Sequence, residues 1–135
     1  MQFTKDKPIL MYSNKIRLLQ QESEWWKRQL AGLQGENTHL KNRLAEIVSL
    51  PISKDLLAEA ENFQHLFIRE DEIIALTKKD VYDFDKWLAR EYSVDGTILD
   101  EMTSRQKKLR NEIEILEQKF NKLKFEFTNY VGENF

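Results

Sequence analysis

Apolar side chains recur along the chain at alternating spacings of three and four positions, in three long stretches. This is the heptad pattern with which a helix buries one narrow stripe against neighbouring helices. The stripes run from Ile9 to Ile47, from Leu56 to Leu88 and from Leu99 to Tyr130. The pattern predicts three long helices, over about residues 7–48, 54–92 and 98–131.

Two short breaks separate the predicted helices. The first break, residues 49–53, contains a proline, which disfavours helical geometry in the residue before it, and Ser53 is suited to cap the next helix. The second break, residues 93–97, has turn composition, and Thr97 is predicted to cap the third helix. Gly132 is predicted to end that helix, because glycine is a common helix stop.

Short connections force consecutive helices to be antiparallel neighbours. We therefore expect an all-α fold, an antiparallel up-down-up three-helix bundle with coiled-coil-like packing, as a single domain over residues 1–135. Asp6 and Ser13 both suit the cap of the first helix. A helical hairpin that donates its third helix to a partner is the alternative. The composition, 33% charged and 41% apolar with four glycines and two prolines, is typical of long packed helices.

Charge and cysteine content exclude several classes of function. The net charge of −2 gives no general attraction to nucleic acid or to anionic membranes. Basic residues are dense from Arg105 to Arg110, but acidic residues interleave along the same helix, so nucleic-acid binding is not expected. No apolar stretch approaches the ~20 residues of a membrane span. The chain has no cysteine, which excludes thiol chemistry and suits a reducing cytoplasm, where we expect the protein.

The two histidines are the only side chains that suggest a metal site. His39 and His65 fall at heptad positions that point away from the bundle, and just one Glu-x-x-His motif, Glu36 to His39, is present. Di-iron bundles need inward carboxylates from several helices. We therefore expect no metal and no cofactor. The chain also lacks phosphate-binding and hydrolase motifs, so no enzymatic activity is expected.

Polar residues interrupt the apolar stripes at five positions: Ser23, Asn37, Glu70, Thr77 and Gln106. A polar residue in such a stripe commonly fixes the register of the helices at a cost in stability. Glu70, with Asn37, is the candidate for a polar core that binds a small ligand. In that interpretation Glu70 occupies a gap thinned by Gly32 and Gly35, and burial raises its pKa. In the other interpretation Glu70 reaches solvent or pairs with Lys119 or Lys122.

Adjacent tryptophans, Trp25 and Trp26, raise the question of what covers each of them. Trp26 belongs to the first stripe, but Trp25 repeats with Met11 and Leu18 every seven residues outside it. Either the helix is rotated so that both tryptophans touch the core, or Met11, Leu18 and Trp25 form an exposed strip. An exposed apolar strip is a marker of association, and tryptophan is enriched in binding hot spots.

Two segments resemble a group of small, uncharacterised, all-helical bacterial proteins. They are Glu24-Trp25-Trp26 with Asn42-Arg43-Leu44-Ala45-Glu46-Ile47-Val48, and Asn62-Phe63-Gln64-His65-Leu66-Phe67-Ile68. The resemblance covers the first two predicted helices. It implies a helical bundle in a bacterial cytoplasm, and it implies no activity and no functional residues.

These features predict a non-enzymatic bundle that acts through protein–protein contact, most simply as a homo-oligomer. Met11, Leu18 and Trp25 are the candidate interface residues. The alternative is a bundle that binds a small ligand or a metal through Glu70, Asn37, His39 and His65.

Overall fold

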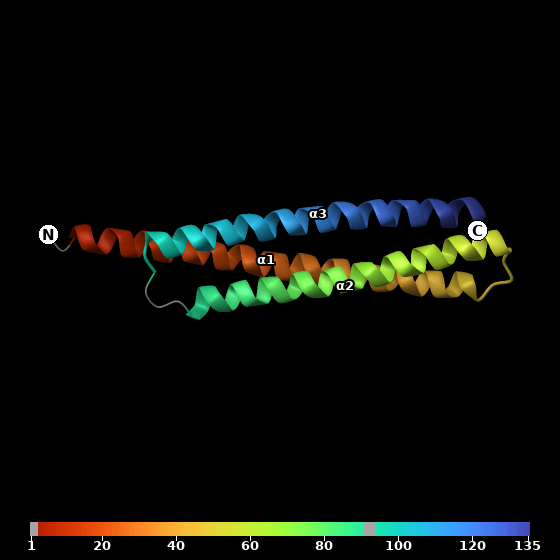
Figure 1. Cartoon of the computed structure of the whole chain (residues 1–135), viewed down its shortest axis with the longest axis horizontal. Coiled ribbons are helices and arrows are strands. Elements are labelled where there is room, and N and C mark those ends of the chain that lie inside the picture. The colour runs from red at the N-terminus through yellow and green to blue at the C-terminus, as the bar shows by residue number, and fades with distance from the viewer. Residues whose placement is uncertain (1–2, 91–93) are drawn as a thin grey trace.

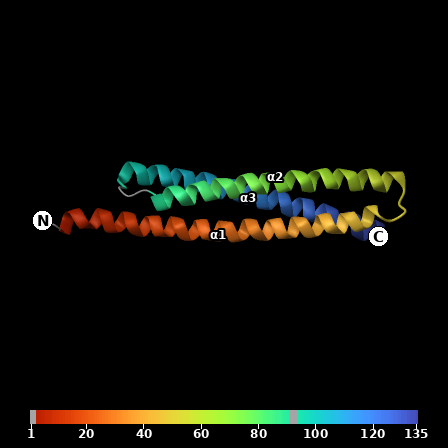
Figure 2. The ribbon, with the colours of Figure 1, turned by 90° about the horizontal axis from the view of Figure 1, so that it is seen from below.

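The computed structural model describes residues 3–90 and 94–135, with side chains from residue 12 onward. Three helices follow one another: α1 (Phe3–Val48), α2 (Lys54–Arg90) and α3 (Gly96–Asn134). They lie side by side in one elongated bundle, with α2 antiparallel to α1 and α3 (Figures 1 and 2). The predicted all-α, up-down-up three-helix bundle is confirmed.

The first connection is formed by the residues that the sequence indicated. α1 ends at Val48, and α2 begins at Lys54, as predicted. Ser53 caps α2, because its Oγ accepts a hydrogen bond from the Leu56 backbone N–H at 3.2 Å. α1 begins at Phe3, earlier than predicted. The predicted end of the second helix at residue 92 lies outside the described residues.

Both predicted ends of α3 were wrong. The cap is Asp95, whose side chain accepts a hydrogen bond from the Ile98 backbone N–H at 2.8 Å, so the helix begins at Gly96 and includes Thr97. At the other end the helix continues through Gly132 to Asn134. No glycine in the described residues has a positive φ, so Gly132 does not adopt the left-handed conformation that ends helices.

The three apolar stripes meet along the bundle axis and form two clusters of buried side chains. The Trp26 cluster includes Leu19, Leu30, Ile74, Val81, Phe84, Met102, Leu109 and Leu116. The Phe67 cluster includes Leu40, Leu44, Ala60, Phe120, Leu123, Phe127 and Tyr130. Leu33 packs against both clusters. The clusters divide at the level of Asn37 on α1 and Glu70 on α2, so the two polar residues interrupt the core near the middle of the bundle.

α1 packs more extensively against α2 than either helix packs against α3. The residues in the stripes supply a physical reason. α1 and α2 carry smaller buried residues, Ser23 and Asn37 on α1 and Ala60 and Thr77 on α2. The buried positions of α3 are all large, from Leu99 to Tyr130. Small facing side chains let two helices approach, whereas large ones hold a helix further out.

Charged pairs along the two edges of α1 repeat with the heptad. Toward α2, Lys27 pairs with Asp85 at 2.9 Å and Lys41 pairs with Asp71. From the first pair to the second, the residue number rises by two heptads on α1 and falls by two heptads on α2, as antiparallel helices require. Toward α3, Glu22 pairs with Arg110 at 2.8 Å and Glu36 pairs with Lys124 at 3.2 Å, each across 88 positions. The residues on α1 are basic on one edge and acidic on the other. This arrangement favours one register and one neighbour for each edge.

We predict that reversing one edge pair weakens the fold and that reversing both partners restores the part of the stability that comes from the contact between helices. Lys27→Glu places a like charge beside Asp85 and also beside Glu24, with which Lys27 pairs at 2.9 Å within α1, and adding Asp85→Lys recreates the attraction to α2 alone. Each single reversal lowers the free energy of unfolding by about 0.5–1 kcal/mol, because both side chains are partly solvated. Urea unfolding of the four proteins measures the coupling.

Lys79→Glu is the matched control, because Lys79 is exposed and makes none of the ion pairs of the described side chains. A double variant no more stable than the sum of the two single variants contradicts a role for this pair in the register.

Candidate protein-interaction surface

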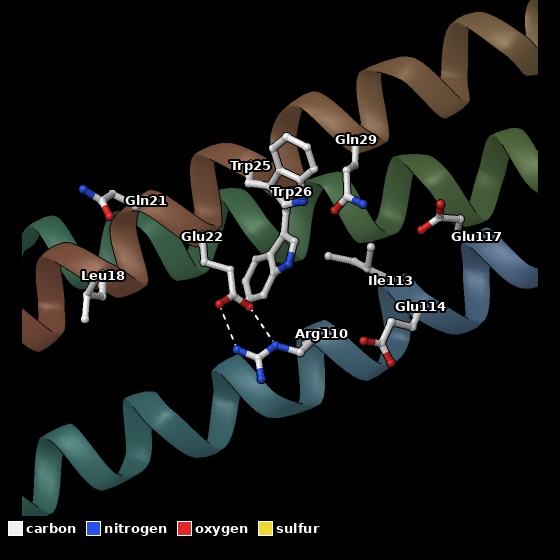
Figure 3. A pocket seen from close by; sticks show the side chains of 10 residues that line it. All are labelled: Leu18, Gln21, Glu22, Trp25, Trp26, Gln29, Arg110, Ile113, Glu114 and Glu117. Carbon is white, nitrogen blue, oxygen red and sulfur yellow. Dashed lines mark hydrogen bonds and ion pairs between the residues drawn. The ribbon is translucent and has the colours of Figure 1, made fainter.

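Neighbouring residues on a helix point about 100° apart, so Trp25 and Trp26 cannot both face the bundle axis. Trp26 is buried, with 3% of its surface exposed, and its ring centroid lies 6.2 Å from that of Phe84. Trp25 remains 56% exposed. Figure 3 shows Trp26 pointing from α1 toward α3 while Trp25 points away from α3. The interpretation that both tryptophans touch the core is wrong.

Trp25 borders an open groove of about 580 Å³ between α1 and α3. Leu18, Gln21 and Gln29 line it from α1, and Ile113, Glu114 and Glu117 line it from α3. Glu22 and Arg110 bridge the groove, with both Glu22 carboxylate oxygens accepting hydrogen bonds from the Arg110 guanidinium at 2.8 and 2.9 Å (Figure 3). The hydrogen bonds that Arg110 donates to Glu22 raise the pKa of Arg110 further above its ordinary value.

Leu18 is 63% exposed and lies seven residues before Trp25, so both side chains are on one line of α1. The expected strip is thus exposed at these two residues. The side chain of Met11, its third predicted member, lies outside the described residues. The exposed line nevertheless continues toward the other end of the helix, through Gly32 and His39.

We define the outer face of α1 as this line together with one exposed line beside it; the next exposed line, which carries Arg17 and Glu24, is not included. Its residues are Asn14, Leu18, Gln21, Trp25, Arg28, Gly32, Gly35, His39 and Asn42, and all nine are exposed. Only Arg28 among them carries a fixed charge, although 33% of the chain is charged. Charged residues are depleted from the centres of protein interfaces. The outer face therefore has the composition of an interface centre.

Gly32 and Gly35 belong to this outer face and do not thin the core beside Glu70, so the predicted glycine-lined gap is wrong. A Cβ atom added to either glycine meets no atom within 4 Å. Both glycines occupy heptad positions outside the buried stripe, which already indicate that they point outward. The predicted gap took into account only their position along the helix axis and not their direction around it.

Several other exposed apolar side chains lie among charged residues, whereas Val48 and Leu50 lie at the uncharged connection between α1 and α2. On α2, Tyr82 is half exposed, and Lys86 covers its ring with Nζ 4.6 Å from the ring centroid. On α3, Ile115 and Phe125 are exposed on a helix in which lysines and glutamates are frequent. Scattered exposed apolar residues are normal on soluble proteins. The outer face of α1 differs from the exposed residues of α2 and α3 because Leu18 and Trp25 lie on one line of the helix, although charged residues of the groove flank them on the side of α3.

Asn37 forms the centre of the polar layer in the bundle. It is fully buried, and its Nδ2 donates hydrogen bonds to the Phe67 backbone carbonyl at 2.9 Å and to Asp71 Oδ1 at 2.7 Å. Lys41 pairs with the other oxygen of Asp71. Asn37 Oδ1 is buried and has no hydrogen-bond partner. These contacts join α1 to α2 at one level, which is how a buried asparagine specifies a register.

Glu70 is buried, with 8% of its surface exposed, and its Oε2 has no hydrogen-bond partner. It lines a groove of about 290 Å³ between α2 and α3, whose rim includes Arg69, Lys119 and Lys122. None of the ion pairs of the described side chains involves it, so the expected pairing with Lys119 or Lys122 is wrong. Burial raises the pKa of Glu70, and the positive charges of Lys119 and Arg69 oppose this without cancelling it.

The two histidines stand apart from this polar layer. His39 and His65 are exposed, as their heptad positions predicted. Within the described part of the chain, no three His, Cys, Asp or Glu side chains are placed to hold one metal ion. The basic residues of α3 are partly engaged with α1, since Arg110 pairs with Glu22 and Lys124 pairs with Glu36.

We predict that Glu70→Leu stabilises the protein, because it removes a buried carboxyl group that lacks a partner. At pH 7 the free energy of unfolding rises by about 1–3 kcal/mol. Glu70→Gln adds a pH signature. The pKa of Glu70 in the fold lies above its ordinary value of 4.5, so the native state binds the proton more tightly than the unfolded chain. The wild type therefore loses stability as the pH rises above about 4.5 and Glu70 gives up its proton. Glu70→Gln has no proton to lose at this position and keeps that stability.

Urea unfolding between pH 5 and pH 8 measures the difference, which widens with pH. Glu61→Gln, at an exposed position of α2, is the matched control and shows no such trend. A constant difference between wild type and Glu70→Gln contradicts the prediction.

Comparison of the chain with protein-family models, with curated proteins and with solved structures found no match. In the described residues, no helix combines the length and the apolar character that crossing a membrane requires.

Proposed function

We propose that the protein is a non-enzymatic helical bundle that acts through protein–protein contact and associates with itself through the outer face of α1. One observation carries the proposal: Leu18 and Trp25, large apolar side chains on one line of α1, are 63% and 56% exposed. Leaving a tryptophan in water forgoes one of the largest apolar burials available to a side chain. A second protein surface that covers it recovers that burial.

The surroundings of the strip support the proposal. The outer face of α1 has one fixed charge, Arg28, and in the groove beside it Glu22 is paired with Arg110, whereas Glu114 and Glu117 make none of the ion pairs of the described side chains. When a partner approaches, a charged side chain that already has an ion-pair partner in the bundle does not lose its water as an isolated charge. Desolvation of unpaired charges opposes association, so such pairing favours docking of an uncharged face.

The linings of the grooves beside Trp25 and Glu70 contain no serine, threonine, cysteine or histidine, which supports a non-enzymatic role. The chain has no cysteine, and both histidines are exposed and lie outside the two grooves beside Trp25 and Glu70. A buried carboxyl group without a neighbouring base or nucleophile does not form an active site. The cysteine-free composition and the resemblance to bacterial helical proteins support a cytoplasmic, bacterial setting.

We predict that the purified protein is a dimer or larger oligomer at micromolar concentration. Trp25→Glu weakens this association by about tenfold or more, because it places a charge where an apolar side chain becomes buried. Helicity is retained, because Trp25 is largely outside the core. Sedimentation equilibrium measures the association, and circular dichroism measures the helicity.

Phe125→Glu is the matched control, since Phe125 is 66% exposed but lies on α3. It leaves the association constant unchanged. A wild-type protein that remains monomeric at high micromolar concentration contradicts the self-association.

A second candidate function is binding of a small ligand in the groove beside Glu70. The observation that favours it is the buried Oε2 without a partner, in a groove with apolar walls and a basic rim. A ligand with a hydrogen-bond donor would satisfy this oxygen. Native mass spectrometry of the purified protein is expected to show a bound small molecule that Glu70→Leu removes. A wild type without added mass contradicts this function.

A further inference from the structure

We infer that the second copy binds as an antiparallel α1 pair, in which Trp25 of each protomer packs over Gly32 of the other. This inference rests on the self-association proposed above and specifies its geometry. It follows from three features of the outer face of α1: two exposed glycines, the lack of charge, and the spacing of Trp25 and Gly32.

The glycines have no role that the single chain explains. Gly32 and Gly35 lie inside a continuous helix, where glycine is less stable than alanine. Neither has a positive φ, and a Cβ atom added at either position meets nothing within 4 Å. Neither the local backbone nor the core therefore requires a glycine there. Glycine does allow a side chain from outside to approach the helix backbone closely.

The outer face is suited to burial along a long segment. From Asn14 to Asn42 it carries one fixed charge, on Arg28, and the long side chain of arginine can extend to the edge of a contact while its stem stays packed. A face with so few charged residues resembles the centres of protein interfaces, where charged residues are depleted. The two halves of this segment differ in size: Leu18 and Trp25 are large, whereas Gly32 and Gly35 are small.

The difference in size selects the orientation of the second copy. In a parallel pair in register, Trp25 faces Trp25 and Gly32 faces Gly32, which leaves a collision at one level and a void at the next. In an antiparallel pair with its twofold axis between residues 28 and 29, each Trp25 lies at the level of the partner's Gly32. The same contact then forms twice, as a twofold interface requires. The face supplies both the large and the small half of the fit, which identifies the partner as a second copy.

Single-cysteine variants test this geometry, because the chain has no cysteine of its own. Asn14→Cys, Arg28→Cys and Asn42→Cys all place a thiol on the outer face of α1. A short bismaleimide is expected to cross-link Arg28→Cys with itself, since residue 28 lies beside the axis. Asn14→Cys and Asn42→Cys do not cross-link alone, but a mixture of the two does, because the antiparallel pairing brings residue 14 of one copy near residue 42 of the other.

The same experiment separates the inference from the proposed function. If Asn14→Cys and Asn42→Cys each cross-link alone and their mixture adds nothing, the pair is parallel and the inference fails while self-association stands. If the variants sediment as dimers and none cross-links, another face is used. If they sediment as monomers, the proposed function fails.

A size variant tests the packing of Trp25 independently. Gly32→Leu fills the space that the partner's Trp25 needs, so it weakens dimerisation by at least about tenfold while helicity is kept or increased. Gly132→Leu is the matched control, because a Cβ atom added there also meets nothing within 4 Å but lies on α3. It leaves dimerisation unchanged. Dimerisation that is insensitive to Gly32→Leu overturns the inference.

Discussion

Each helix of this bundle has one apolar stripe, and that stripe can be buried only against the stripes of the other two helices. The fold depends on bringing all three together in one register, because a slip of one heptad along a uniform apolar stripe changes the buried area little. Polar residues remove this ambiguity. Asn37 donates to the Phe67 carbonyl and to Asp71, and a slip of α2 separates these groups and leaves more polar atoms buried without partners.

The polar layer has a cost as well as a use. Glu70 and Asn37 divide the core into two apolar clusters, and each keeps one buried oxygen without a partner. Asn37 compensates for part of this by joining α1 to α2 through two hydrogen bonds. Glu70 makes no such bond. That imbalance distinguishes a residue that specifies the register from one that only reduces stability, and it is why the groove beside Glu70 is the second candidate site.

The same register organises the surface. Because the edges of α1 are engaged with α2 and α3 through pairs such as Lys27 with Asp85 and Glu22 with Arg110, the side of α1 that faces solvent is left without partners. On that side the chain places Trp25 and two glycines on lines whose one fixed charge is Arg28, with Arg17 and Glu24 on the next exposed line. The fold and the proposed interface therefore use different sides of α1. The charged edges hold the bundle together, and the outer face, whose one fixed charge is Arg28, is available to a second protein.

The sequence by itself determined the number of helices, their order and antiparallel arrangement, and the residues that fill the core, because the heptad spacing states which side of each helix is apolar. It also determined the cap at Ser53, which depends on a local hydrogen bond. The sequence did not determine the cap of α3, because Asp95 and Thr97 are both suitable residues and the helix is capped by Asp95.

Only the tertiary structure decided what surrounds Glu70, which lies in an apolar stripe, and Trp25, which lies outside one. Whether Glu70 is paired depends on how close the lysines of α3 come to it. The large buried side chains of α3 hold that helix further out, so α3 packs less tightly against α1 and α2 than those two helices pack against each other. Whether Trp25 is covered depends on the rotation of α1 relative to two neighbours. Spacing along one chain fixes the direction of a side chain, but only the packed neighbours determine what it meets.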